Sequence, residues 1–121
     1  MTALLVALGA AVGAPLRFLV AHHLDRLGAP HPERHWPRGT LLVNLAGSAV
    51  LGFCAARSLD GNALALVGTG FCGGLTTYSA FAVQVHDVGR LRGAAYAAVS
   101  IVLGVAAAAL GFVLGQALGQ A

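Results

Sequence analysis

The chain carries very little charge for its length. Only 9% of its 121 residues are charged and 58% are hydrophobic, with a mean hydropathy of +0.81. A water-soluble domain has roughly 25% charged residues, so this composition excludes an ordinary soluble protein. The sequence predicts an integral membrane protein, and its length leaves room for a single compact helical domain over residues 1–121.

Lysine is absent, and all seven basic residues are arginines scattered along the chain. A nucleic-acid-binding surface needs clustered basic residues, so we expect no nucleic-acid partner. Cysteine is scarce as well, because the chain has Cys54 and Cys72 alone, both in apolar segments and without C-x-x-C spacing. This pattern disfavours a disulfide or a zinc site and predicts buried thiols.

Acidic residues are missing from the apolar segments: Asp25, Glu33, Asp60 and Asp87 lie at segment ends or in loops. Coupling to protons needs a carboxylate within the membrane, so a proton-driven transporter is disfavoured. The sequence shows no pairing of a nucleophile with a base, and we do not expect an enzyme. His31 and His35 have helical metal-ligand spacing, but the intervening Pro32 favours solvated loop histidines.

Four apolar segments fill nearly the whole chain and are expected to cross a membrane as helices. They cover residues 2–21, 40–56, 62–85 and 93–118. Small residues recur at helical spacing, which lets helix backbones approach closely in lipid. These pairs are Gly9 and Gly13, Gly70 and Gly74, and Gly111 and Gly115. The predicted fold is therefore an all-α membrane protein with four transmembrane helices.

A glycine-rich run interrupts the third segment. Residues 68–81 read GTGFCGGLTTYSAF, with the adjacent Gly73 and Gly74 near the middle of an uncharged stretch. In lipid an unsatisfied backbone group costs several kcal/mol, so a break survives only where protein, water or a bound ion supplies partners. The sequence predicts a break in the third helix, centred on these glycines, and an ion or solute path beside it.

Polar side chains are few within the spans, and two of them have alternative interpretations. Arg17 lies late in the first segment, where it either extends to the lipid headgroups or lines an anion vestibule. Asn44 lies deeper and can form a helix–helix hydrogen bond or contact a ligand.

The third and fourth segments each place several polar or aromatic groups on one face. Tyr78, Phe81 and Gln84 share a face, for which core packing is the commoner explanation. Tyr96 and Ser100 put two hydroxyls on one face of the fourth segment, as a polar track or as simple interhelical bonding.

Arginines are distributed unevenly between the two ends of the predicted bundle. The connections at one end contain five, namely Arg26, Arg34, Arg38, Arg90 and Arg92. The connection at the other end contains Arg57 alone. Because basic residues stay on the cytoplasmic side, the sequence predicts that both termini lie outside the cell.

Three motifs occur in the order and spacing of one known family. They are G-x-x-x-G-A-x-x-R-F from Gly9, G-T-L-x-V-N from Gly39, and the run of residues 70–81. In these motifs the chain resembles the CrcB/Fluc family of small fluoride channels over nearly its whole length. The resemblance implies passive, fluoride-specific efflux across the plasma membrane, which lowers fluoride toxicity to the cell.

The same resemblance implies an antiparallel dimer with two fluoride pores and a structural sodium ion at the dimer interface. Sodium would be bound by the backbone carbonyls of Gly73 and Thr76 from each subunit. The residues implied for the ion pathway are Thr40, Asn44, Tyr78, Phe81, Tyr96 and Ser100. Arg17 and Gln84 are implied in a vestibule or in a structural role.

Four positions near the implied path depart from the family pattern. Tyr78 replaces a phenylalanine, Ala80 a threonine, Gln84 a glutamate, and Gly104 a second hydroxyl residue of the fourth segment. The Tyr78 hydroxyl either donates to the anion or obstructs it, and Gly104 removes a donor. We therefore expect weakened conduction through one pore.

Two questions stay open at the level of sequence. An antiparallel homodimer needs one sequence to insert both ways, whereas the arginine bias favours a fixed orientation and a separate, oppositely oriented paralogue. Two rival functions also remain. A small four-helix multidrug exporter would need a membrane carboxylate that the first segment lacks, and a non-transporting scaffold would leave Asn44 and the glycine-rich run unexplained.

Overall fold

The computed structural model describes residues 1–26 and 36–121. The interpretation of His31 and His35, and the charges of Glu33 and Arg34, therefore concern residues outside the described ranges. Four helical spans are long and apolar enough to cross a membrane, and the described ranges contain no β-strand. The prediction of an all-α protein with four transmembrane helices is confirmed.

The helices begin and end close to the predicted bounds. The first span is α1 (Thr2–Ala21), which continues into the π-helical turn η1 (His22–Arg26). The second is α2 (Arg38–Ala56), and the fourth is α6 (Arg90–Gln120). The third consists of α3 (Gly61–Ala63), the π-helical η3 (Leu64–Cys72), α4 (Gly73–Leu75) and α5 (Tyr78–Asp87).

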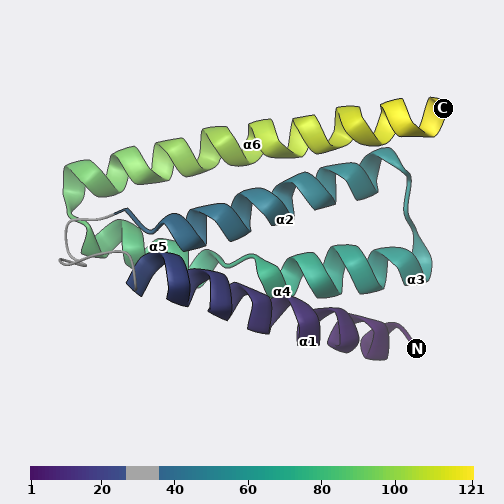
Figure 1. The fold of residues 1–121 in the computed structure, drawn as a ribbon, viewed down its shortest axis with the longest axis horizontal. Helices are drawn as coiled ribbons and strands as arrows, with labels where there is room; N and C mark the ends of the chain where they lie inside the picture. Colours follow the sequence, from purple (N-terminus) through teal and green to yellow (C-terminus); the bar gives the residue numbers. More distant parts are fainter. Residues whose placement is uncertain (27–35) are drawn as a thin grey trace.

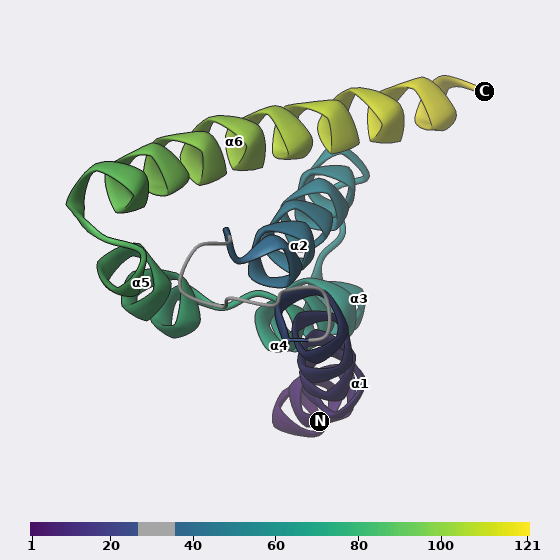
Figure 2. The same cartoon turned by 60° about the vertical axis from the view of Figure 1, so that its left-hand side comes forward.

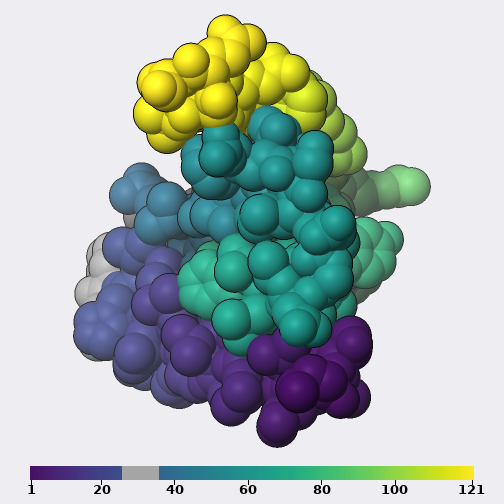
Figure 3. Space-filling view, turned by 90° about the vertical axis from the view of Figure 1, so that its right-hand side faces the viewer, coloured from purple at the N-terminus to yellow at the C-terminus, as the bar shows by residue number. Residues whose placement is uncertain are grey.

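The spans lie side by side as an elongated bundle (Figure 1), with α2 against α6 and α1 against η3 and α4. Both termini lie at one end, as an even number of crossings requires. Figure 3 looks onto that end, where the tip of α6 extends beyond α2 and the chain between α2 and α3. Figure 2 shows that α6 crosses the other spans at an angle. Its outer surface is therefore left for lipid or for another subunit.

Glycines bring the helix backbones into direct contact at both interfaces. A Cβ atom at Gly74 would lie 2.9 Å from the Cα of Ala10, and one at Gly9 would lie 2.6 Å from the backbone nitrogen of Phe71. On the other side of the bundle, a Cβ at Gly111 would collide with the carbonyl oxygen of Ala49. The predicted close packing of small residues is thus confirmed, and it suits helix association in lipid.

The break in the third span lies further along the chain than predicted. Gly73 is helical, with φ −63° and ψ −36°, and Gly74 belongs to the same helical turn. The extended residues are Thr76 (φ −83°, ψ 159°) and Thr77 (φ −151°, ψ 125°). The third span is therefore broken near its middle and within residues 68–81, as predicted, but the break falls just after the two glycines rather than on them. Gly74 lacks a side chain and so allows the backbone of α1 to approach closely, while β-branched residues such as Thr76 and Thr77 favour an extended backbone.

Candidate functional site

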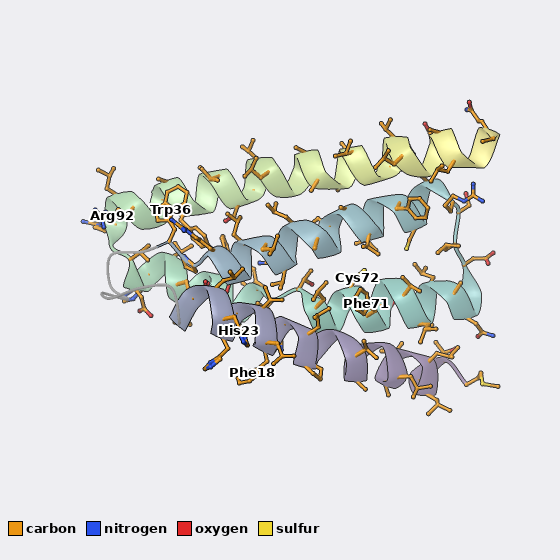
Figure 4. All side chains as sticks on the ribbon, in the orientation of Figure 1. Phe18, His23, Trp36, Phe71, Cys72 and Arg92 are labelled. Carbon is orange, nitrogen blue, oxygen red and sulfur yellow. The ribbon has the colours of Figure 1, made fainter. Side chains whose placement is uncertain are left out.

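The site is built around the break, here meaning the two extended residues Thr76 and Thr77. At its first residue, Thr76 still donates its backbone N–H to the carbonyl of Cys72, at 2.9 Å. The Thr76 hydroxyl donates to the same oxygen, at 2.8 Å. Cys72 lies on the third span just before the break and is buried (Figure 4). The Cys72 carbonyl in the last turn of the upstream helix is therefore held by two donors of Thr76.

Asn44 of α2 binds both backbone groups of Thr77, whose N–H has lost its helical acceptor. Its Oδ1 accepts the Thr77 backbone N–H at 2.8 Å, and its Nδ2 donates to the Thr77 carbonyl at 3.1 Å. One side-chain amide thus satisfies a backbone N–H that would otherwise be costly in lipid and adds a second donor at the carbonyl of the same residue. Of the two interpretations of Asn44, the structure shows the interhelical hydrogen bond, and one Nδ2 hydrogen is left for a further acceptor.

The helix restarts directly after Thr77. The Thr77 hydroxyl accepts the backbone N–H of Ala80 at 3.2 Å, as an N-terminal capping residue does. The Thr77 hydroxyl also lies 3.3 Å from that of Ser79. Thr77 therefore connects the break to α2 through the hydrogen bonds of its backbone with Asn44, and it caps α5 through its own hydroxyl.

The carbonyls of Gly73 and Thr76 are among those released from regular helical bonding at the break. The usual donor to the Gly73 carbonyl is the N–H of Thr77, which binds Asn44 instead. The usual donor to the Thr76 carbonyl is the N–H of Ala80, which binds the Thr77 hydroxyl instead. Gly73 and Thr76 are the residues predicted to bind sodium. Uncharged backbone oxygens of this kind are suitable ligands for a hard monovalent cation.

Arg17 approaches one of these two carbonyls. Its guanidinium Nη1 donates to the Thr76 oxygen at 3.0 Å, linking α1 to the break. Arg17 is part-buried, so the guanidinium neither points freely into a vestibule nor extends fully to the headgroups. A carbonyl oxygen has two lone pairs, and one remains for another ligand at Thr76.

An open groove of about 550 Å³ runs along the break between α2 and α6. Four predicted pathway residues line it: Asn44, Tyr78, Phe81 and Ser100. Gly73 and Thr76 line it as well, so the predicted cation ligands and most of the predicted anion path meet on one surface. Gly104 also lies there, at the position that lacks the family's second hydroxyl.

Aromatic rings continue from the groove toward the start of α6. The ring centroids of Tyr78 and Phe81 are 6.0 Å apart, and those of Phe81 and Tyr96 are 5.7 Å apart. Trp36 extends the series, 5.9 Å from Tyr96, and lies beside the beginning of α6 (Figure 4). Tyr78 is 80% exposed whereas Tyr96 is fully buried. The series therefore leads from the open groove into the interior.

Thr40, Tyr96 and Gln84 do not line the groove. Gln84 Nε2 donates to the Thr40 hydroxyl at 2.9 Å, and the Tyr96 hydroxyl donates to the Pro37 carbonyl at 3.5 Å. Thr40 is 2% exposed. The structure thus separates the predicted pathway residues into a groove set and a buried set, with Phe81 touching both.

Ser100 combines burial with an unsatisfied hydroxyl. Its Oγ lies near the Tyr96 hydroxyl, but it makes no hydrogen bond of standard geometry within the described part of the chain. A buried hydroxyl of this kind is costly unless a partner is supplied. Ser100 lines the groove as a residue, while its Oγ atom itself is buried.

Sequence reasoning missed several residues of the site. Thr77 was part of the glycine-rich run but received no role, although it bonds Asn44 and restarts the helix. The groove hydroxyls of Ser48 and Thr69 were not considered. Ser48 follows Asn44 by one helical turn, so spacing along α2 was a usable signal. The pairing of Thr77 with Asn44 had no signal of this kind, because it joins different spans.

Fold and site together define a small multi-pass integral membrane protein with a broken helix beside a groove lined by uncharged donors. The profile of a family described as "CrcB-like protein, Camphor Resistance (CrcB)" matches residues 4–112. This match covers most of the chain, which therefore belongs to the CrcB family.

Curated relatives cover nearly the same length. "Fluoride-specific ion channel FluC 2" of Rhodococcus jostii is 48% identical over 116 residues, covering 93% of this chain and 96% of that protein. "Fluoride-specific ion channel FluC 1" of Parasynechococcus marenigrum is 45% identical over 124 residues, covering 93% and 92%. "Fluoride-specific ion channel FluC 2" of Mycobacterium tuberculosis is 44% identical over 104 residues, covering 83% and 79%.

Proposed function

We propose that this protein is a fluoride-specific ion channel of the cell membrane. The observation that carries the proposal is the groove at the break, whose lining includes the amide residue Asn44 and the hydroxyl residues Ser48, Thr69 and Ser100. Fluoride is strongly hydrated, so its water must be replaced by hydrogen-bond donors and by the positive edges of aromatic rings. The lining contains donors and rings but no carboxylate among the described residues. Relatives named as fluoride-specific ion channels support the same function.

Transport is passive in this proposal. The described spans contain no internal acidic residue that could couple transport to protons, since Asp25 and Asp87 lie at span ends. Hydrogen fluoride enters cells as a weak acid and dissociates inside, so an open path for the anion suffices to lower the internal fluoride concentration. Expression of the chain should therefore restore growth in fluoride to a cell that lacks its own exporter.

Efflux from loaded liposomes tests the function directly. Vesicles that contain the purified chain should release fluoride quickly and chloride at the rate of protein-free vesicles. Equal release of both anions would contradict fluoride specificity. A lack of release would favour a non-transporting scaffold, and release that requires a proton gradient would favour a small multidrug-type exporter.

We further propose that a structural sodium ion binds the released carbonyls of Gly73 and Thr76. The geometry supporting this is the diversion of both usual N–H donors to other acceptors. A single chain offers two such oxygens on the groove, so a second subunit is needed to complete the coordination. The Arg17 contact at Thr76 weakens the attraction for a cation, because it places a positive group beside one ligand. Replacing sodium with N-methylglucamine throughout preparation should reduce dimer stability and fluoride flux together.

The proposed assembly is an antiparallel dimer across the groove face. Its partner is either a second copy of this chain or an oppositely oriented paralogue, the alternative favoured by the arginine bias. Expressing and purifying the chain alone decides between them. A stable dimer that conducts fluoride would establish the homodimer, whereas a monomer that becomes active on adding the paralogue would establish the heterodimer.

A further inference from the structure

Asp25 at the end of the first span caps the beginning of α2. Its Oδ1 accepts the backbone N–H of Gly39 at 2.6 Å, and its Oδ2 accepts from the Thr40 hydroxyl at 3.5 Å. Gly39 makes this approach possible, because a Cβ there would lie 2.7 Å from the Cα of Ala21 and 3.1 Å from Asp25 Oδ2. A carboxylate is also favourable beside the positive end of the helix dipole.

The Thr40 hydroxyl connects Asp25 to Gln84. Thr40 has one hydroxyl hydrogen, and an ionised carboxylate can only accept, so the hydrogen of Thr40 is committed to Asp25. The Thr40 oxygen must then accept from its other neighbour. Gln84 accordingly presents its NH₂ group, with Nε2 at 2.9 Å from the Thr40 oxygen. We call these three side chains the polar relay. In it, Gln84 donates a hydrogen bond to Thr40, and Thr40 donates one to Asp25.

The direction of the relay leaves one atom unsatisfied. Because the NH₂ group of Gln84 faces Thr40, its carbonyl oxygen Oε1 is turned elsewhere, and it is buried without a hydrogen-bond partner among the described residues. A buried acceptor without a partner is destabilising. Reversing the amide would place a donor at the same point. The charge at Asp25 therefore decides whether an acceptor or a donor occupies that position.

We propose that Asp25 is a positioning residue that sets the hydrogen-bond direction of the relay and thereby the orientation of the Gln84 amide. Its second effect rests on the proposed function: Gln84 lies one helical turn after Phe81 on α5, so the direction of the relay tunes fluoride conduction. Asp25 touches neither the groove nor the proposed sodium ligands. It acts through Thr40.

Substitutions that exchange donors and acceptors test the direction of the relay without any transport measurement. Gln84→Glu places carboxylates on both sides of Thr40, which has a single hydrogen to give. This variant should lower the melting temperature by roughly 5 °C. Adding Asp25→Asn should restore it, because the asparagine Oδ1 still accepts from Gly39 while its NH₂ donates to Thr40. The Thr40 hydrogen is then free to go to the carboxylate introduced by Gln84→Glu.

Asp87→Asn provides the matched control for net charge. Asp87 ends α5 at the same end of the bundle (Figure 1), its side chain is 67% exposed, and its ion pair with His86 is long, at 3.5 Å. Adding Asp87→Asn to Gln84→Glu removes the same charge but leaves Thr40 between two carboxylates. It should not restore the melting temperature. Equal rescue by both second substitutions, or rescue by neither, would overturn the proposal.

Fluoride flux tests the second effect. Asp25→Asn should change the flux about threefold or more when residue 40 is threonine, and should have little effect in a Thr40→Val background, where no hydroxyl transmits the change. An equal change in both backgrounds would show that Asp25 acts only as a helix cap or through its charge. A parent chain without flux would refute the proposed channel, while the melting-temperature rescue would still decide the direction of the relay.

Discussion

At the scale of single residues, one side-chain amide makes the break tolerable within a membrane. Asn44 replaces the lost helical acceptor of the Thr77 N–H and also donates to the Thr77 carbonyl, and it does so from a neighbouring span. This explains why an amide, rather than a hydroxyl, suits position 44, since a hydroxyl brings one hydrogen and cannot reach both backbone groups at once. The groove therefore depends on Asn44 for its shape as well as for a donor.

Asn44→Ala should consequently destabilise the fold as well as stop conduction. Leaving the Thr77 N–H unpaired costs about 1–3 kcal/mol, whereas the Thr77 carbonyl keeps its place at the start of α5. Thermal unfolding in detergent and liposome flux measure the two effects. Asn62→Ala, on the exposed α3 turn at the far end of the third span, is the matched control. Loss of flux with an unchanged melting temperature would mean that Asn44 contacts the ion without supporting the break.

Phe81 is the second residue with a distinct prediction, because its ring touches both the groove and the buried Tyr96. Phe81→Ile keeps an apolar side chain but removes the aromatic edge that can face an anion. We expect lower fluoride flux with folding retained. Phe112→Ile, at a 40% exposed position of α6 outside the groove lining, should leave flux unchanged. Equal flux in the two variants would exclude a role for the Phe81 ring.

At the scale of helices, glycines determine how closely the spans approach. The α2–α6 pair depends on Gly52 and Gly111, whose added Cβ atoms would collide with the carbonyl oxygens of Ala108 and Ala49. The α1–η3 pair depends on glycines in the same way. These contacts hold the two halves of the broken span in place, because α4 is anchored to α1 while α5 contacts α6.

Gly111→Ala should therefore lower stability by about 1–3 kcal/mol through overpacking. Gly104→Ala is an unusually close control, since it makes the same change in the same helix. A Cβ at Gly104 would meet only the Ser48 hydroxyl oxygen, at 3.9 Å. Thermal unfolding of both variants should separate them clearly. Similar melting temperatures would indicate that α6 shifts to relieve the collision.

At the scale of the whole molecule, the groove face is incomplete in a single chain. Gly73 is exposed, and an added Cβ there would have no atom within 4 Å. Tyr78 on the same groove is 80% exposed. An ion path open along its length to lipid would be unfavourable. The proposed second subunit would close it.

Gly73→Ala distinguishes the fold of the subunit from its assembly. The isolated chain has room for the methyl group, so helical content and monomer folding should be retained. If Gly73 faces a partner and a shared sodium ion, the dimer should weaken, which cross-linking in liposomes at increasing dilution would detect. Undiminished cross-linking would place the dimer interface on another face.

The sequence by itself determined the membrane class, the number of spans and nearly all their bounds. These follow from hydropathy and length, because a helix that crosses lipid must be apolar over about 20 residues. It also predicted that the third span is broken, and it selected Asn44, Phe81 and Ser100, which line one groove.

Only the tertiary structure decided where the break lies and what satisfies it. Gly73 and Gly74 favour a break as readily as Thr76 and Thr77 do, yet both are helical, and Gly74 is in close contact with α1. The hydrogen bonds between Asn44 and Thr77 join residues that are 33 positions apart in the sequence. The relay from Gln84 to Asp25 joins three separate spans. Such hydrogen bonds depend on how helices pack in space, and that arrangement is not contained in any local pattern of residues.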